Sequence, residues 1–379
     1  MGISVLDGFV SAATRDAAIQ KFYTSAAWID GRAEEQLKHV SNWAGVQKIA
    51  AFPDLHPGKY GPVGCAVLAD RIYPQLIGND IGCGMALFQI DLPKRKFKLE
   101  KALRRMRVLG HDPSTDYSAR LDETDARMRS FSKSLGTIGG GNHFCEVQTL
   151  VTCEPDVGLD VGALYLLIHS GSRGYGTAVL ADVPHDGFNG MHPDADATSA
   201  YLAGHDQAAR WARLNRRIIA ERAADALRTD VRLIADVPHN LLVRVGDGWL
   251  HRKGAAQADA GLVPLAGSRA TPSYLLQPSH TEAALWSTAH GAGRRYDRSS
   301  MHGRVGTKRS DLEAMQRTSF GGRVICEDRA LLIEEAPLAY KSAAAVAADL
   351  EATGVAKTVA TFHPLLTFKK TRTGGLRNA

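Results

Sequence analysis

The chain has 379 residues, of which 44% are hydrophobic and 23% are charged, and no apolar run approaches the length of a membrane span. The formal net charge of +6 is compatible with a polyanionic partner such as nucleic acid, although many proteins carry as much without one. The five cysteines are widely spaced and the first residues lack a secretory signal, which predicts a reducing cytoplasm and argues against a disulfide framework.

The first half of the chain alternates strand-like and helical patterns. Between 47 and 72, short apolar runs flank the segment PDLHPGKYGPVG, which predicts strands and tight turns. Residues 94–135 are rich in Lys and Arg and show helical spacing at Leu99, Leu103 and Met106, with an interruption at 111–114. The run 164–169 predicts a buried strand that ends in the loop HSGSRGYG.

Residues 200–228 predict a long amphipathic helix. Its apolar positions are expected to face the core: Trp211, Leu214, Ile218, Ile219 and Leu227. Its arginines are expected to form a solvated side, with an RNA-facing side as the alternative: Arg210, Arg213, Arg216, Arg217 and Arg222. Strand patterns return at 231–251 and 323–335, and an Ala-rich helix is expected near 338–352. Because strands and helices mix without a regular βαβ rhythm, an α+β fold is favoured over a doubly wound sheet.

The stretch LIGNDIGCGMALF at 76–88 carries the first candidate chemistry. Asp80 and Cys83 lie three residues apart among glycines, which let the backbone turn tightly. A carboxylate and a thiolate on such a turn can both face one metal ion. The alternative is a common Gly-rich turn with a buried structural cysteine.

Three histidines occupy comparable positions beside glycines or at the ends of apolar runs. His143 follows a triple glycine, His169 ends the predicted buried strand, and His239 precedes another strand. Together with Asp80 and Cys83 they form a mixed donor set that suits Mn²⁺, Fe²⁺, Co²⁺ or Zn²⁺. A thiolate that bridges two ions would permit a two-metal site for phosphate chemistry. Spacing alone leaves their convergence open, since a single histidine is more often structural.

The segment TAHGAGRR at 288–295 carries a different signal. His290 stands before Gly291 and Gly293, where a phosphate could approach closely, and Arg294 supplies positive charge. An imidazole placed this way can accept a phosphoryl or nucleotidyl group. The alternative is a Gly-rich surface turn. Upstream, the loops HRKGAA and PLAGSRATPSY could cradle phosphate or pair with a purine edge, although neither is a P-loop.

Nine motifs, in order between 53 and 341, resemble the RtcB family of RNA ligases: PDLHPGK, GNDIGCGM, GGGNHF, HSGSRG, PHN, HRKGA, AGS…SY, AHGAGR and EEAPLAYK. The resemblance implies a single RtcB-like catalytic domain over 1–370, with mixed and antiparallel sheets around a central metal and nucleotide site and helices outside. The tail at 371–379 is expected to be flexible. The implied reaction joins an RNA 2′,3′-cyclic phosphate or 3′-phosphate end to a 5′-hydroxyl end, with GTP and Mn²⁺.

The resemblance also implies residue roles. Two Mn²⁺ ions would be held by Asp80, Cys83, His143, His169 and His239, with Cys83 as the bridge. His290 would attack the α-phosphate of GTP and become guanylylated, with Asn142 beside the phosphates as a second catalytic residue. The nucleotide would further contact Glu146, Ser268, Ser273, Gly291, Gly293, Arg294, Tyr340 and Lys369. Arg173 is expected to contact the RNA phosphate.

Several features depart from the usual family pattern. The stretches between His169 and His239 and between His239 and His290 are short, Arg269 and Pro272 enter the guanine-side loop, and the chain continues past Lys369. These features resemble the short bacterial paralogues linked to release factor H, and predict cytoplasmic repair of tRNA or rRNA near the ribosome, with no membrane association. Two alternatives stay open: a metal-dependent cyclic-phosphate phosphoesterase that does not seal, and a non-catalytic RNA- or ribosome-binding factor.

Overall fold

The computed structural model describes residues 17–121, 126–184, 189–259 and 261–371. None of the helices in these ranges is long and apolar enough to cross a membrane. The tail that was expected to be flexible begins at Thr371, which is buried, and the remainder of the tail lies outside the described residues.

An eight-stranded sheet forms the larger part of the core. Its order is β11-β12-β15-β5-β6-β4-β7, with β14 beside β15, and every pairing is antiparallel except that of β14 with β15. The strands are β4 (Gly84–Pro93), β5 (Phe144–Cys153), β6 (Ala163–Ser170), β7 (Val231–Pro238), β11 (Val263–Leu265), β12 (Ser273–Pro278), β14 (Arg323–Cys326) and β15 (Ala356–Lys370).

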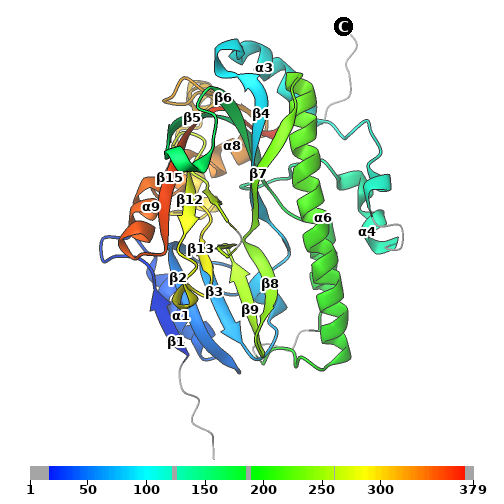
Figure 1. The fold of residues 1–379 in the computed structure, drawn as a ribbon, viewed down its shortest axis with the longest axis vertical. Coiled ribbons are helices and arrows are strands. Elements are labelled where there is room, and N and C mark those ends of the chain that lie inside the picture. The colour runs from blue at the N-terminus through cyan, green and yellow to red at the C-terminus, as the bar shows by residue number, and fades with distance from the viewer. Residues whose placement is uncertain (1–16, 122–125, 185–188, 260, 372–379) are drawn as a thin grey trace, which may run out of the picture.

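A five-stranded sheet lies below it in the view of Figure 1. Its order is β1-β2-β3-β9-β8, parallel only between β1 and β2, and a two-stranded ribbon pairs β10 with β13. The strands are β1 (Ala18–Lys21), β2 (Val46–His56), β3 (Val63–Ala69), β8 (Asn240–Val245), β9 (Gly248–Lys253), β10 (Ala255–Gln257) and β13 (Ser287–Ala289). The predicted α+β class with mostly antiparallel sheets is therefore confirmed.

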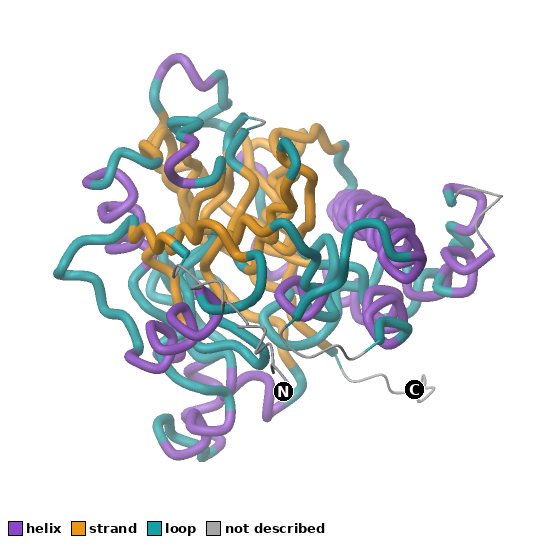
Figure 2. Tube along the Cα trace, turned by 90° about the horizontal axis from the view of Figure 1, so that it is seen from below, coloured by secondary structure: helices purple, strands orange, loops and turns teal. Residues whose placement is uncertain are grey.

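Helices surround the strands, as Figure 2 shows. They are α1 (Gly31–Ser41), α2 (Pro74–Ile77), α3 (Leu99–Met106), α4 (Ala126–Ser130), α5 (Gly174–Ala181), α6 (Asp196–Leu227), α7 (Arg309–Met315), α8 (Arg329–Glu334) and α9 (Ala343–Ala352). The longest, α6, runs along one side of the molecule beside β7 (Figure 1). Ile219 and Ala223 of α6 join an apolar cluster with Ala86, Leu166 and other residues of the large sheet.

The predicted helix at 200–228 is confirmed, but its arginines divide into two groups. Arg210, Arg213 and Arg217 are exposed as expected. Arg216 and Arg222 are only 1% and 8% exposed, so the expected solvated side was wrong for these two. Arg222 donates hydrogen bonds to the backbone carbonyls of Val108, His111 and Gly136, which offsets the cost of burying its charge.

Other predicted elements agree except at their boundaries. The strands expected at 47–72, 164–169 and 231–251 are present. Strand β2 extends to His56 and so includes the first four residues of the segment PDLHPGKYGPVG, which was expected to form a turn. The pattern at 323–335 is a strand only as far as Cys326. Helix α8 follows because the Asp328 side chain caps it by accepting a hydrogen bond from the Leu331 amide. The Ala-rich helix begins at Ala343, after the Ser342 cap.

Candidate active site

A cavity of about 1020 Å³ opens between the two main sheets. Every candidate residue except Ser273 lines it: Asp80, Asn142, His143, Glu146, His169, Arg173, His239, Ser268, His290, Gly291, Gly293, Arg294, Tyr340 and Lys369, together with Cys83. One hollow therefore brings together residues that lie far apart in the sequence.

Strand pairing explains why the metal-ligand candidates meet. Strands β5, β6, β4 and β7 are neighbours and antiparallel, so the start of β5, the end of β6, the start of β4 and the end of β7 share one sheet edge. In register, Phe144 faces His169, Gly84 faces Ser170, and Gly84 also faces Pro238. His143, Cys83 and His239 are each the next residue beyond a paired one. The topology thus places all three beside His169.

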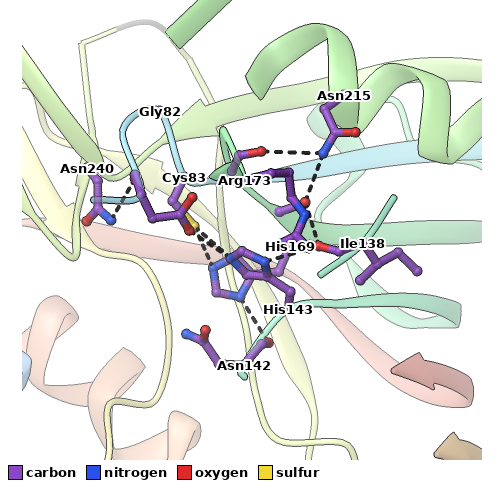
Figure 3. A network of polar contacts seen from close by, with 12 residues as sticks. Gly82, Cys83, Ile138, Asn142, His143, His169, Arg173, Asn215 and Asn240 are labelled. Atoms are coloured by element: carbon purple, nitrogen blue, oxygen red, sulfur yellow. Dashed lines mark hydrogen bonds and ion pairs between the residues drawn. The ribbon is translucent and has the colours of Figure 1, made fainter. Parts of the chain in front are cut away.

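The central group comprises Cys83, His143 and His169, whose ligand atoms lie within 4.8 Å of one another. The Cys83 Sγ is 3.3 Å from Nε2 of His143 and 3.2 Å from Nε2 of His169 (Figure 3). A carboxylate oxygen of Asp80 lies 2.9 Å from Nε2 of His143. On the other side, the His239 ring centre is 5.1 Å from that of His169.

The hydrogen bonds of the imidazoles determine which nitrogen faces the centre. Nδ1 of His143 contacts the Ile138 carbonyl at 3.1 Å, and Nδ1 of His169 contacts the Asn142 carbonyl at 3.2 Å. A carbonyl only accepts, so both Nδ1 atoms donate. When the rings are neutral, their Nε2 lone pairs point at the sulfur and the Asp80 carboxylate.

Electrostatics of this centre fit a bound cation. Burial, together with the neighbouring histidines, lowers the pKa of His169 and of His239 well below the ordinary value and keeps both rings neutral. Burial and the Asp80 charge raise the pKa of the Cys83 thiol, which therefore needs a cation to become a thiolate. Nδ1 of His239 is buried and has no hydrogen-bond partner within the described ranges. A bound metal ion would accept the converging lone pairs of these side chains and would give the unpaired His239 nitrogen a partner.

One turn of α6 supports the segments that carry these ligands. Asn215 donates to the Thr137 carbonyl and the Ser170 hydroxyl, both at 3.1 Å, and accepts from the Gly136 amide at 2.7 Å. Figure 3 shows Asn215 reaching toward this network. No sequence pattern indicates this role for Asn215.

Arg216 completes the support from the next position of the helix. Its Nη1 donates to the Gly82 carbonyl at 2.7 Å and to the Ser170 carbonyl at 3.0 Å. Its Nε donates to the Asp236 carboxylate at 2.7 Å. Gly82 precedes Cys83 and Ser170 follows His169, so the guanidinium joins two ligand-bearing segments.

His290 lies at the end of β13, with its ring centre 4.1 Å from that of His239. Its Nδ1 is 2.7 Å from the Gly254 carbonyl and 2.9 Å from a carboxylate oxygen of the fully buried Asp54. Nδ1 therefore carries the proton, which leaves the Nε2 lone pair of the neutral ring available as a nucleophile. Asp54 was not predicted as a site residue, although it stands within the PDLH motif.

Glu335 is a second site residue that was not predicted. Its carboxylate accepts from Arg294 at 3.0 Å, from Arg298 at 3.3 Å and from Lys369 at 3.5 Å, and the Tyr340 hydroxyl also donates to it. Burial would raise its pKa, but Lys369 and Arg294 outweigh burial and lower the pKa to about 2. Glu335 thus remains ionised and holds Arg294, Tyr340 and Lys369 together.

Glu146 occupies a different environment in the same cavity. It is 3% exposed and accepts hydrogen bonds from Gln148 at 2.7 Å and from the Thr367 hydroxyl. Burial raises its pKa to about 7, against the opposing effect of these hydrogen bonds. Within this cavity Glu335 therefore stays charged, whereas burial shifts the pKa of Glu146 toward neutrality.

The loop at 267–273 is held by internal hydrogen bonds. Ser273 does not line the cavity; its hydroxyl accepts from the Gly267 amide at 3.0 Å and from Gln148 at 3.1 Å. Arg269, at the departure from the family pattern, is buried and donates to the carbonyls of Leu332 and Glu335. This arginine ties the loop to α8.

Arg173 borders the cavity next to the candidate metal ligands. Its backbone has a φ of +58°, which is unusual for a residue with a side chain. A Cβ at Gly139 would lie 2.1 Å from the Arg173 guanidinium, so glycine at this position leaves the arginine its space. Asn142 lines the cavity as well, and its carbonyl orients His169.

The sequence matches the family model described as "tRNA-splicing ligase RtcB" over residues 36–117 and 112–370. It is 40% identical to RNA-splicing ligase RtcB2 of Escherichia coli, over 90% of this chain and 93% of the relative. It is 27% identical to RNA-splicing ligase RtcB of Escherichia coli strain K12, over 88% of this chain and 94% of that protein. It is 28% identical to tRNA-splicing ligase RtcB of Archaeoglobus fulgidus, over 88% and 90% of the two chains.

Proposed function

The chain belongs to the RtcB family, whose members are named RNA-splicing ligases, and we propose from this premise that it is a GTP- and Mn²⁺-dependent RNA ligase. It would join an RNA end with a 2′,3′-cyclic phosphate or 3′-phosphate to a 5′-hydroxyl end. The observation that carries the proposal is the placement of His290 beside His239, at the border between the metal-donor group and the charged pocket around Glu335.

In this proposal the metal ligands are Asp80, Cys83, His143, His169 and His239. Asp80 contacts His143, the ring of His239 neighbours that of His169, and Cys83 lies between the two imidazoles, so its sulfur is suited to bridge two ions. When bound, the Mn²⁺ ions would neutralise the triphosphate and align the pyrophosphate for departure.

His290 is the proposed nucleophile. Its Nε2 attacks the α-phosphate of GTP, a P–N bond forms, and the bond to pyrophosphate breaks. The proton on Nδ1 stays in place, shared with the Gly254 carbonyl and the Asp54 carboxylate. Because the imidazole becomes cationic on guanylylation, the buried Asp54 stabilises the product. Asp54 is thus proposed to position and charge-balance His290.

His290 then passes the guanylate to the 3′-phosphate of the RNA, which has been formed by opening a cyclic phosphate. The 5′-hydroxyl attacks this activated phosphate and GMP leaves. Arg173, next to the metal ligands, would hold the RNA phosphate, and Asn142 would lie beside the reacting phosphates. Lys and Arg contacts to backbone phosphates would supply affinity that is independent of sequence.

The nucleotide would lie against Glu146, Ser268, Gly291, Gly293, Arg294, Tyr340 and Lys369, all on the cavity wall. Ser273 would act through the Gly267 amide that it holds. We propose residues 1–370 as the catalytic domain. We also propose a cytoplasmic repair role on damaged tRNA or rRNA, linked to release factor H and the ribosome, supported by the short segments and by the Arg269 loop.

Incubation with α-labelled GTP and Mn²⁺, followed by denaturing electrophoresis, tests the central step. An acid-labile label should appear on the wild-type protein and disappear in His290→Ala. The exposed His302, in the neighbouring segment, offers a matched control, and His302→Ala should keep the label. Absence of label from metal-loaded wild-type protein would overturn the ligase mechanism and favour a phosphoesterase that opens cyclic phosphates without sealing. Retention of label in His290→Ala would overturn the assignment of His290.

A further inference from the structure

Four side chains form a ladder in which aromatic rings and guanidinium groups alternate: Trp28, Arg295, Tyr296 and Arg304. The Arg295 guanidinium lies 5.5 Å from the Trp28 ring centre and 5.4 Å from that of Tyr296. The Arg304 guanidinium lies 3.9 Å from the Tyr296 ring centre. Each step of the ladder is within cation–π distance.

Two ladder residues alternate along the chain with residues of the catalytic cavity wall, although none of the four ladder side chains lines the cavity itself. Arg294, directly before Arg295, and Asp297, directly after Tyr296, both line that cavity. Asp297 and Pro57 also line a shallower groove of about 610 Å³, whose other wall includes Arg32 and Lys59. The two hollows therefore share part of a wall, which includes Asp297, the residue directly after Tyr296.

Exposure and charge distinguish most of this surface from core packing, while one side of the partly buried Tyr296 packs against the apolar cluster of Met301, Ile333, Ala336 and Ala339. Trp28 is 42% exposed although Arg295 and Lys341 lie near its ring, and Tyr60, near Lys59 beside the groove, is 44% exposed. Both Arg295 and Arg304 are exposed. The segment 294–309 contains six Lys or Arg residues and a single acidic residue. Exposed aromatic rings in a cationic surround offer both a stacking face and a positive charge, a combination that favours a polyanion with free aromatic bases.

We propose that this ladder is a stacking platform for unpaired nucleotides of an RNA end, next to the terminus that reacts in the His290 cavity. This inference rests on the proposed ligase function. Bases in single-stranded RNA present free π-faces that stack on aromatic rings and on guanidinium planes, without regard to sequence. A base inside a duplex has no such free face. The platform therefore selects RNA ends with a single-stranded overhang.

Binding of a short fluorescent single-stranded RNA with a 3′-phosphate, followed by anisotropy, tests the platform. Loss of one stacked base should weaken binding by about 10-fold or more in Trp28→Ala and in Arg295→Ala. Arg295→Lys, which keeps the charge but loses the planar group, should still bind several-fold more weakly than wild type. Arg244→Ala is the matched control, because Arg244 lies 5.9 Å from the Trp249 ring and neither residue lines the catalytic cavity.

Two further readouts separate stacking from other causes. Trp28→Phe should keep the affinity but lose part of the quenching of tryptophan fluorescence that RNA produces. A blunt duplex with the same end should compete at least about 10-fold less well than the overhang. Equal competition would identify a general polyanion contact and overturn the platform.

Guanylylation of His290 requires no RNA and should be unchanged in all these variants. Unchanged RNA affinity in Trp28→Ala and Arg295→Ala, with normal guanylylation, would overturn the platform alone. Missing guanylylation in the wild type would instead overturn the proposed ligase function on which it rests.

Discussion

Replacement of Arg216 by methionine tests whether α6 holds the metal-binding segments together. The side chains of Arg216 and Asp236 are 1% and 8% exposed, and their bond is 2.7 Å long. Methionine resembles the aliphatic part of the arginine side chain, so the change removes mainly the guanidinium group with its charge and donors. Asp236 would keep only the distant Arg213, at 3.9 Å, and the carbonyls of Gly82 and Ser170 would lose a donor.

Breaking a buried ion pair from one side costs about 3–5 kcal/mol, because the remaining charge stays buried without compensation. The exposed Arg213 can move toward Asp236, so the lower end, about 3 kcal/mol, is expected. For a chain of this size that corresponds to a fall of roughly 4 °C in melting temperature. Affinity for Mn²⁺ should fall about 10- to 100-fold, since Gly82 and Ser170 adjoin two proposed ligands.

Thermal unfolding and metal titration of purified protein measure the two effects separately. Arg217 on the same helix is the matched control: its side chain is 59% exposed and pairs with Glu221, so Arg217→Met should cost at most about 0.5 kcal/mol. The double variant Arg216→Met/Asp236→Leu should have a free energy of unfolding at least about 2 kcal/mol higher than that of Arg216→Met, while its metal affinity stays low. If Arg216→Met lowers the free energy of unfolding by less than about 1 kcal/mol, or leaves metal affinity unchanged, the reasoning is refuted.

Three other predictions concern the centre of the site. Cys83→Ala should abolish both ligation and guanylylation. A chelator should lower the melting temperature of the wild-type protein but not that of the variant. Retained guanylylation with normal metal content would contradict the bridging role. Gly293 has a φ of +70°, and a Cβ there would lie 2.2 Å from the Asp54 carbonyl oxygen. Gly293→Ala should therefore lower the free energy of unfolding by at least about 2 kcal/mol and slow guanylylation. Gly321, with a φ of +74° and open space, is the control, and equal effects of the two substitutions in denaturant unfolding would exclude the proposed clash. Burial raises the pKa of Glu146 from 4.5 to about 7, so the folded protein binds the extra proton and stability should fall by up to about 3 kcal/mol as pH rises through this window. Glu146→Gln should flatten that part of the pH profile, and an unchanged slope would show that Glu146 does not cause it.

The sequence identified residue types better than their surroundings. His169 could be predicted at a strand end because its apolar run is short and bounded, and the donor set indicated a transition metal. Convergence could not be predicted from spacing, because it depends on four antiparallel strands sharing one edge. Family resemblance supplied the roles that spacing left open.

Buried charges mark the limit of pattern-based prediction. Arg216 and Arg222 were assigned to a solvated face because arginine on an amphipathic helix usually snorkels to water. Their burial depends on loop carbonyls contributed by distant segments. Asp54 and Glu335 lie inside the motifs PDLHPGK and EEAPLAYK, but their spacing from other polar residues does not mark them as site residues. At 323–335 the apolar pattern fitted strand and helix alike, and the Asp328 cap decided where the helix begins.

Strand β15 has a consequence for the timing of synthesis. It lies between β12 and β5 in the large sheet and brings Thr367 and Lys369 into the cavity. On the ribosome the last proposed metal ligand, His239, emerges well before Lys369, by an interval on the order of 10 s. A nascent chain can therefore present the proposed metal donors and His290 before the strand that completes the proposed nucleotide pocket exists. Under the proposed function, the order of translation would withhold reactivity toward GTP until β15 has joined the sheet.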